Sequence, residues 1–133
     1  MYRLMVEEGF SSAHSISGYP GNCRRTHGHN YKVRIYLKNE ELDNLGMVFD
    51  FKEIKKKLKD VILPFDHQNL NEIPPFDKTP PTSENIAFYI FENLKKVIPS
   101  LYEVRISEKD GRWAGYSILD SYSASHFYLG IKA

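Results

Sequence analysis

The stretch Cys23-Arg24-Arg25-Thr26-His27-Gly28-His29-Asn30-Tyr31 leads into a run in which apolar residues occupy every second position as far as Leu37. Such alternation is typical of a strand with one buried face, and it predicts a strand from about Gly28 to Leu37. If the strand begins at or near His27, its two-residue repeat places the imidazoles of His27 and His29 on the same face. Two parallel imidazoles with the thiol of Cys23 nearby indicate a metal site or a catalytic site.

The chain before this stretch predicts a second strand that carries a third imidazole. Residues 1–10 again place apolar side chains at alternate positions, and His14 closes this strand ahead of a loop rich in Ser and Gly. If the loop joins two adjacent antiparallel strands, His14 returns towards His27 and His29. The three imidazoles could then converge.

The chain after the stretch predicts two helices and further strands. Asp50 and Thr82 have the features of helix N-caps, and Pro64 and Pro99 mark the ends of the two helices. Residues 101–107 alternate again as a strand that delivers Glu108, and 114–119 and 124–131 predict two more strands. The expected apolar stripes are Phe51, Ile54, Leu58 and Val61 or Ile62 in the first helix, and Ile86, Ile90, Leu94 and Val97 in the second.

This order of elements predicts an α+β fold with one domain over residues 1–133. Helices grouped between antiparallel strands pack together on one face of the sheet. The other face carries aromatic side chains and still needs cover, so we expect its face or its edges to be buried in an oligomer. Residues 117–133 are expected to form an extra C-terminal strand or tail.

Composition excludes several classes of partner. With 18 basic and 17 acidic residues the chain has a net charge of +1, so it lacks the basic excess typical of nucleic-acid binders. No apolar run is long enough to predict a membrane span, and the N-terminus does not resemble a signal peptide. A lone cysteine fits a reducing compartment, and we expect a cytoplasmic protein.

The polar residues allow more than one chemistry. Three histidines with an open fourth position form a catalytic zinc site, whereas Cys23 as a fourth ligand would close the site and make it structural. We favour three histidines with a free thiol, which a nearby metal would activate as a base. Asp66 beside His67 predicts an acid–base pair, against the alternative that adjacent loop residues point apart. Glu108 by itself is ambiguous.

These motifs, taken as an ordered set, resemble the 6-pyruvoyltetrahydropterin synthase superfamily, and within it the 6-carboxy-5,6,7,8-tetrahydropterin synthases of queuosine biosynthesis. The resemblance covers the chain to about Tyr116. The motifs that carry it are Phe10-Ser11-Ser12-Ala13-His14, Cys23-x-x-x-His27-Gly28-His29-Asn30-Tyr31, Gly46-Met47-Val48-Phe49-Asp50-Phe51, Asp66-His67-Gln68-Asn69-Leu70-Asn71, Pro81-Thr82-Ser83-Glu84-Asn85 and Val104-Arg105-Ile106-Ser107-Glu108.

The resemblance implies a tunnelling fold of order ββααββ, whose sheets join into an oligomeric β-barrel. It implies a homohexamer made of two trimers, with active sites between subunits. It also implies a zinc-dependent lyase acting on 7,8-dihydroneopterin triphosphate, with the product 6-carboxytetrahydropterin formed by loss of acetaldehyde and triphosphate. The implied roles are zinc binding for His14, His27 and His29, proton transfer for Cys23, Asp66 and His67, and a grip on the pterin ring for Glu108.

Alternatives remain open within and outside this class. A pyruvoyl-forming synthase only eliminates triphosphate, and an aldolase-like activity on dihydroneopterin is related; a zinc-stabilised oligomer without catalysis is the third possibility. The three residues between Cys23 and His27 resemble the carboxy-forming group. Two features depart from the family pattern, namely Lys109 in place of the usual Thr and the longer C-terminus after Tyr116.

Overall fold

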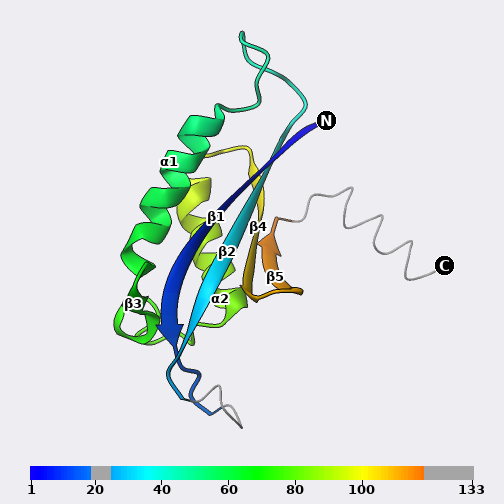
Figure 1. The fold of residues 1–133 in the computed structure, drawn as a ribbon. Helices are drawn as coiled ribbons and strands as arrows, with labels where there is room; N and C mark the ends of the chain where they lie inside the picture. The colour runs from blue at the N-terminus through cyan, green and yellow to red at the C-terminus, as the bar shows by residue number, and fades with distance from the viewer. Residues whose placement is uncertain (19–24, 119–133) are drawn as a thin grey trace, which may run out of the picture.

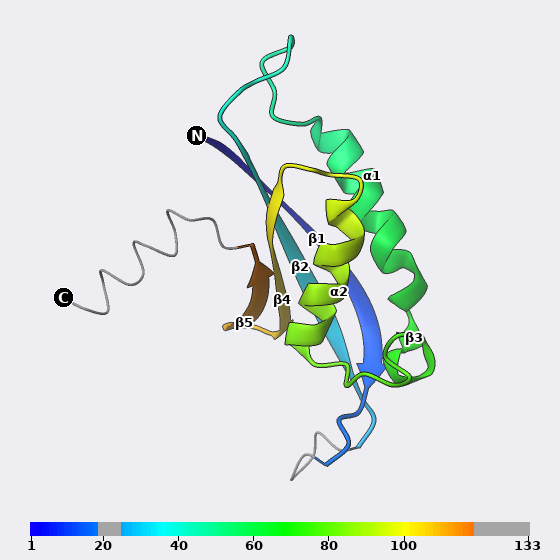
Figure 2. The same ribbon diagram turned by 180° about the vertical axis from the view of Figure 1, so that it is seen from behind.

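The chain folds as a single mixed layer of strands covered on one face by two helices. The computed structural model describes residues 1–18 and 25–118, and Figures 1 and 2 show it from opposite sides. The main strands are β1 (Tyr2–His14), β2 (His27–Asn39), β4 (Leu101–Lys109) and β5 (Arg112–Ser117), and the helices are α1 (Phe51–Ile62) and α2 (Ser83–Lys95). The predicted α+β class and the order of these elements are confirmed.

The sheet has the order β3-β1-β2-β4-β5. Its main strands pair antiparallel, and β1 and β2 stay in register along their whole length, so that His14 lies directly opposite His27. The short β3 (Gln68–Asn69) pairs parallel with β1 at Ser12 and Ala13. Sequence alternation does not reveal this strand, because two residues are too few to show a period.

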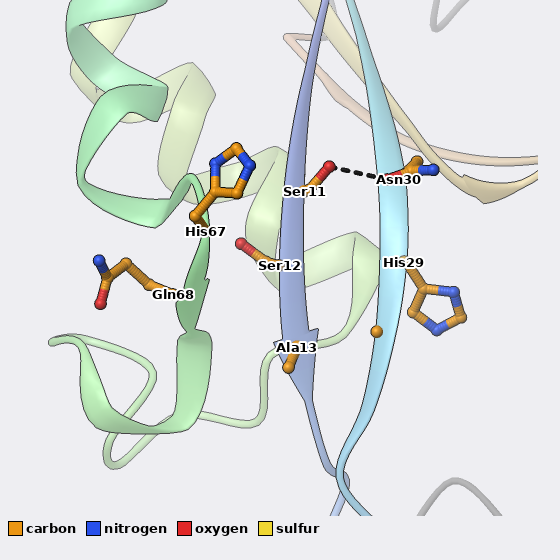
Figure 3. A pocket seen from close by; sticks show the side chains of 8 residues that line it. Ser11, Ser12, Ala13, His29, Asn30, His67 and Gln68 are labelled. Atoms are coloured by element: carbon orange, nitrogen blue, oxygen red, sulfur yellow. Dashed lines mark hydrogen bonds between the residues drawn. The ribbon is translucent and has the colours of Figure 1, made fainter.

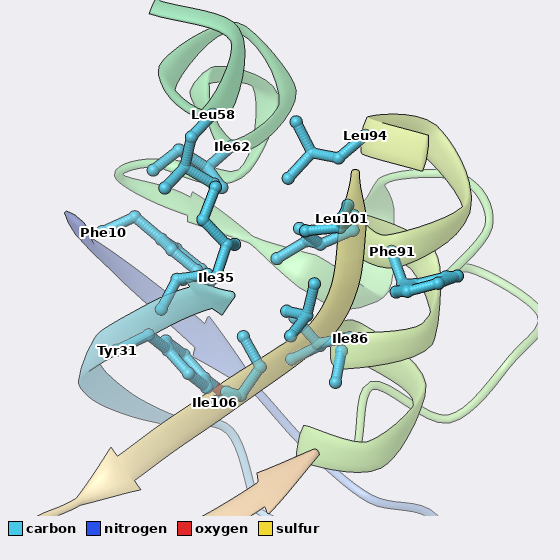
Figure 4. Close-up of a cluster of buried hydrophobic side chains, with 14 of the residues drawn as sticks. Phe10, Tyr31, Ile35, Leu58, Ile62, Ile86, Phe91, Leu94, Leu101 and Ile106 are labelled. Carbon is cyan, nitrogen blue, oxygen red and sulfur yellow. The ribbon is translucent and has the colours of Figure 1, made fainter. Parts of the chain in front are cut away.

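The core lies between the sheet and the helices (Figure 4). Alternate residues of β1, β2 and β4 face α1 and α2, and side chains such as Val33, Ile35 and Leu58 are fully buried. Burial of this apolar surface is the main force that holds the helices on the sheet. The opposite face of the sheet carries Tyr36, Arg105 and Trp113, with the Arg105 guanidinium 4.7 Å from the centre of the Tyr36 ring.

Both helices begin at the predicted caps. The Asp50 side chain accepts a hydrogen bond from the Lys52 N–H, and the Thr82 side chain accepts one from the Asn85 N–H. The prediction that Phe51 and Val97 belong to the buried apolar faces of the helices was wrong. Phe51 is 53% exposed and Val97 is 47% exposed. Phe51 is the first residue of its helix and Val97 lies beyond the end of α2, so neither position is held against the sheet.

Two turns of 3₁₀-helix lie between the helices, ahead of a Pro-rich segment that spans residues 73–81. The first, Leu63–Phe65, contains Pro64 and extends the chain past the end of α1. The second, Leu70–Glu72, follows β3. Within the described ranges no helix has the length and apolar character needed to cross a membrane. The strand predicted over 124–131 and most of the predicted tail lie outside the described residues.

Candidate metal centre

Three imidazoles meet where β1 and β2 end. His14 is the last residue of β1, and His27 and His29 occupy alternate positions at the start of β2. One ring nitrogen from each histidine lies within 4.8 Å of those of the other two. The three ring centres are 4.6 to 5.0 Å apart, and the angles between the ring planes are 69° to 89°. The structure thus brings together the three histidines that the sequence singles out.

Hydrogen bonds hold the outer side of two of these rings. His27 Nδ1 lies 2.7 Å from the Arg25 carbonyl oxygen, and because a carbonyl only accepts, this nitrogen carries the proton and leaves Nε2 with a lone pair. His14 Nδ1 lies 2.9 Å from the Pro81 carbonyl oxygen. A histidine that binds a metal through one ring nitrogen typically makes a hydrogen bond to a carbonyl oxygen through the other.

The third imidazole supplies the clearest sign that a cation fits here. His29 Nε2 is buried, and within the described part of the chain it has no hydrogen-bond partner. A buried polar atom without a partner costs stability, and a metal ion between the three nitrogens would satisfy it. Burial lowers the pKa of His14 and of His29, which favours the neutral rings that a metal requires. The residues present therefore fit a three-histidine metal site.

Glu108 lies beside the same cluster. Its Oε2 atom is 3.7 Å from His14 Nε2 and 4.0 Å from His29 Nε2, and it comes from the end of β4. The carboxylate therefore faces the imidazoles and adds negative charge to the centre.

Asp66 and His67 form a pair at the edge of the sheet. The Asp66 Oδ1 atom accepts a hydrogen bond of 2.9 Å from the Ser11 N–H and lies 3.0 Å from His67 Nδ1. His67 has a positive φ of 58°, and this left-handed conformation turns its ring back to its neighbour. The alternative that these adjacent side chains point apart is wrong for this structure.

The Asp66 carboxylate gives a testable dependence on pH. The Ser11 hydrogen bond, followed by the nearby His67, holds the pKa of Asp66 below its usual value of 3.8. The ionised Asp66 carboxylate therefore stabilises the folded protein at pH values above 3.8. This stabilisation is lost as the pH falls through the lowered pKa and the carboxylate takes up a proton. We expect Asp66→Asn to lower the thermal unfolding midpoint at about pH 7, and the difference from wild type to shrink at about pH 3. Asp60→Asn, on the exposed face of α1, is the control and should show no such dependence.

The Asp66–His67 pair and the three histidines lie apart within one chain. Figure 3 shows His67 beside β1, whereas the His29 ring leaves β2 on the side away from β1. Both residues line one open hollow of about 400 Å³, but among the described residues no hydrogen bond or ion pair connects the pair to the imidazoles. Cys23, the predicted base, lies outside the described residues.

Two contacts at this centre escape sequence reasoning. The Pro81 carbonyl approaches His14 from a segment 67 positions away in the chain, and no local pattern reports such a contact. The Tyr31 hydroxyl lies 3.0 Å from His14 Nδ1. The two-residue repeat of the strand could have identified Tyr31, because Tyr31 follows His29 by two residues and therefore lies on the same face of β2.

Comparison with known proteins places the chain in one family. The family model described as 6-pyruvoyl tetrahydropterin synthase matches residues 3–118. A 6-carboxy-5,6,7,8-tetrahydropterin synthase of Synechocystis sp. is 34% identical over 114 residues, which cover 81% of this chain and 87% of the relative. The human 6-pyruvoyl tetrahydrobiopterin synthase is 39% identical over 102 residues, covering 72% of this chain and 70% of the relative.

The fold agrees as well. The structure of Caenorhabditis elegans 6-pyruvoyl tetrahydropterin synthase superposes with a TM-score of 0.79 at 33% identity, covering 89% of this chain and 96% of that one. The matched residues include the strands that carry the three histidines and the loop that carries Asp66 and His67. This chain belongs to the 6-pyruvoyl tetrahydropterin synthase family, a family of pterin-acting enzymes with the tunnelling fold.

Proposed function

We propose that the chain is a zinc-dependent 6-carboxy-5,6,7,8-tetrahydropterin synthase, which converts 7,8-dihydroneopterin triphosphate and one water molecule to 6-carboxytetrahydropterin, acetaldehyde and triphosphate. The observation that carries the proposal is the convergence of three imidazole nitrogens within 4.8 Å of one another. Nitrogen ligands in a set of three suit Zn²⁺ with an open position. Bound there, zinc would act as a Lewis acid that stabilises negative charge developing on the substrate side chain.

The remaining roles belong to side chains of the protein. Cys23 is proposed as the base that removes a proton from the substrate side chain, and His67, oriented by Asp66, as the group that returns a proton. The carboxylate and ring 3.0 Å apart support this assignment, because a carboxylate stabilises the protonated imidazole. Glu108 is proposed to accept two parallel N–H bonds from the amino-pyrimidine edge of the pterin.

We further propose that each active site is completed by a neighbouring subunit of a homohexamer made of two trimers. Two features support assembly. Among the described residues, the outer edge of β1 pairs with another strand only at Ser12 and Ala13, and Ser11 bonds to Asp66 and His67. The rest of this long edge is not paired by any described strand, and an unpaired edge favours pairing with another chain. The second feature is that His67 and the ring of His29 lie on opposite sides of the β1–β2 ribbon within one chain (Figure 3).

The location of the reaction follows from the proposed base. The chain has one cysteine, and the proposed mechanism needs it as a free thiol. A reducing compartment keeps thiols free, which favours the cytoplasm.

The competing function is the pyruvoyl-forming reaction, which the human and Caenorhabditis elegans relatives carry in their names. The spacing of three residues between Cys23 and His27 favours the carboxy-forming reaction. Incubation of the zinc-loaded protein with 7,8-dihydroneopterin triphosphate, followed by mass analysis, separates the two. We expect 6-carboxytetrahydropterin together with acetaldehyde and triphosphate. A pyruvoyl product without acetaldehyde would assign the rival function, and absence of any product would favour a non-catalytic zinc-stabilised oligomer.

A further inference from the structure

Tyr31 is in direct contact with the proposed metal centre but is closed off from solvent. It is 1% exposed, and its ring stacks on Phe10 with ring centres 4.8 Å apart and planes 9° from parallel. Its hydroxyl lies 3.0 Å from His14 Nδ1. A side chain this deeply buried cannot bind a substrate, so any effect it has on the site acts through the side chains that it touches. Its ring lies beside the rings of His14 and His29, and its hydroxyl contacts His14.

Two groups compete for the same nitrogen of His14. The Pro81 carbonyl oxygen, 2.9 Å from Nδ1, can only accept a proton, whereas a phenol both donates and accepts. Burial, with a further contribution from Glu108, raises the pKa of Tyr31, so the phenol keeps its proton. A protonated Nδ1 donates to the Pro81 carbonyl or to the Tyr31 oxygen, and in either case the phenol proton loses Nδ1 as its acceptor. An unprotonated Nδ1 accepts from Tyr31, at the cost of a lone pair that faces the Pro81 oxygen. The choice fixes which ring nitrogen of His14 carries the proton.

The contact on the other side of the ring makes this choice important. His14 Nε2 lies 3.0 Å from His27 Nε2, and the latter is an acceptor because the Nδ1 proton of His27 points to the Arg25 carbonyl. If Tyr31 donates to Nδ1, the proton of His14 is on Nε2 and forms a hydrogen bond to His27. If Nδ1 donates to Pro81, two lone pairs face each other at this distance, which is favourable only with a cation between them.

We propose that Tyr31 is a positioning residue that holds His14 of the metal-free protein in the Nε2–H tautomer and thereby restrains metal affinity. The inference rests on the metal site of the proposed function. Metal loading moves one proton of His14 from Nε2 to Nδ1 with no net release, and the new Nδ1–H donates to Pro81. The Tyr31 hydroxyl then loses the one acceptor that it has among the described residues, and a buried donor left without an acceptor opposes loading. Without metal, the same hydroxyl keeps the imidazoles of His14 and His27 hydrogen-bonded and in place.

The Tyr31→Phe variant tests the proposal through the affinity for Zn²⁺ alone. The variant keeps the ring that stacks on Phe10 and removes only the hydroxyl. We expect it to bind Zn²⁺ about tenfold more tightly than wild type in competition with a chelating dye, because loading no longer strands a buried donor. An unchanged or weaker affinity would overturn the proposal, since a hydroxyl that merely supports the ligand predicts weaker binding. Tyr89→Phe is the matched control: Tyr89 packs on Phe65 and Phe76 in the core, and its loss of a hydroxyl should leave the affinity unchanged.

The tautomer itself can be read in the metal-free protein. With ¹⁵N-labelled histidine, NMR distinguishes a protonated ring nitrogen from one with a lone pair. We expect His14 to carry its proton on Nε2 in wild type and on Nδ1 in Tyr31→Phe. The same tautomer in both proteins would refute the role of Tyr31. If the wild-type protein failed to bind zinc at all, the metal-dependent function would fall, while this NMR comparison would still decide the tautomer assignment.

Discussion

The His29→Ala variant should lose at least about 100-fold in Zn²⁺ affinity, since removal even of groups that only support a ligand costs 10- to 100-fold. Turnover of the pterin substrate should fall by about a thousandfold, because a Lewis acid supplies several kcal/mol and each 1.36 kcal/mol is tenfold in rate. Atomic absorption of the purified protein and the product assay measure the two effects. Retention of a full equivalent of tightly held zinc would contradict a site made by these histidines.

Removal of His29 should disturb the fold less than removal of His14. His14 is buried and bonded to Pro81, whereas His29 Nε2 has no hydrogen bond to lose within the described chain. The metal-free variant should therefore remain folded, with an unfolding midpoint near that of chelator-treated wild type. Metal that binds only the folded state raises that midpoint, so zinc should stabilise wild type and not His29→Ala. Asn30→Ala, the next residue on β2 with its side chain bonded to Ser11, is the control and should keep its zinc.

The period of β2 explains why much of this centre could be predicted from the sequence. A strand repeats every two residues, so His27 and His29 had to share a face once the alternation from Tyr31 to Leu37 was recognised. His14 followed because a connection between neighbouring antiparallel strands brings their adjoining ends together. Local rules of this kind also located both helices, whose caps at Asp50 and Thr82 involve residues only two or three positions apart.

The parts that sequence reasoning could not supply depend on contacts between distant segments. The Pro81 carbonyl behind His14 and the Ser11 N–H that fixes Asp66 both come from residues more than fifty positions away. Their positions follow from the path of the Pro-rich segment and of β3, neither of which has a periodic signal. The sequence and the family resemblance both indicated Asp66 and His67 as an acid–base pair, but only the structure shows that His67 and the His29 ring lie on opposite sides of the β1–β2 ribbon.

That separation leads to the second large effect, which is recovery of activity by mixing two inactive variants. If the imidazoles of one chain work with Asp66 and His67 of its neighbour, His29→Ala and His67→Asn damage complementary halves of each site. Asn suits position 67 because it tolerates the left-handed conformation that His67 adopts and cannot act as an acid or base near neutral pH. We expect each variant alone to be nearly inactive. In oligomers formed at random from equal amounts of both chains, about a quarter of the sites combine two intact halves.

The measurement uses co-expression of the two variants with different affinity tags, tandem purification of the mixed oligomers, and the product assay. Activity close to a quarter of wild type would establish that neighbouring chains share each site. If a single chain supplied both halves, every site in the mixture would carry one lesion and no activity could return. The control pairs His29→Ala with His27→Ala, which damage the same half and should stay inactive in any mixture. This contrast separates shared sites from simple stabilisation by assembly, because both mixtures form the same oligomer and only one of them can rebuild an intact site.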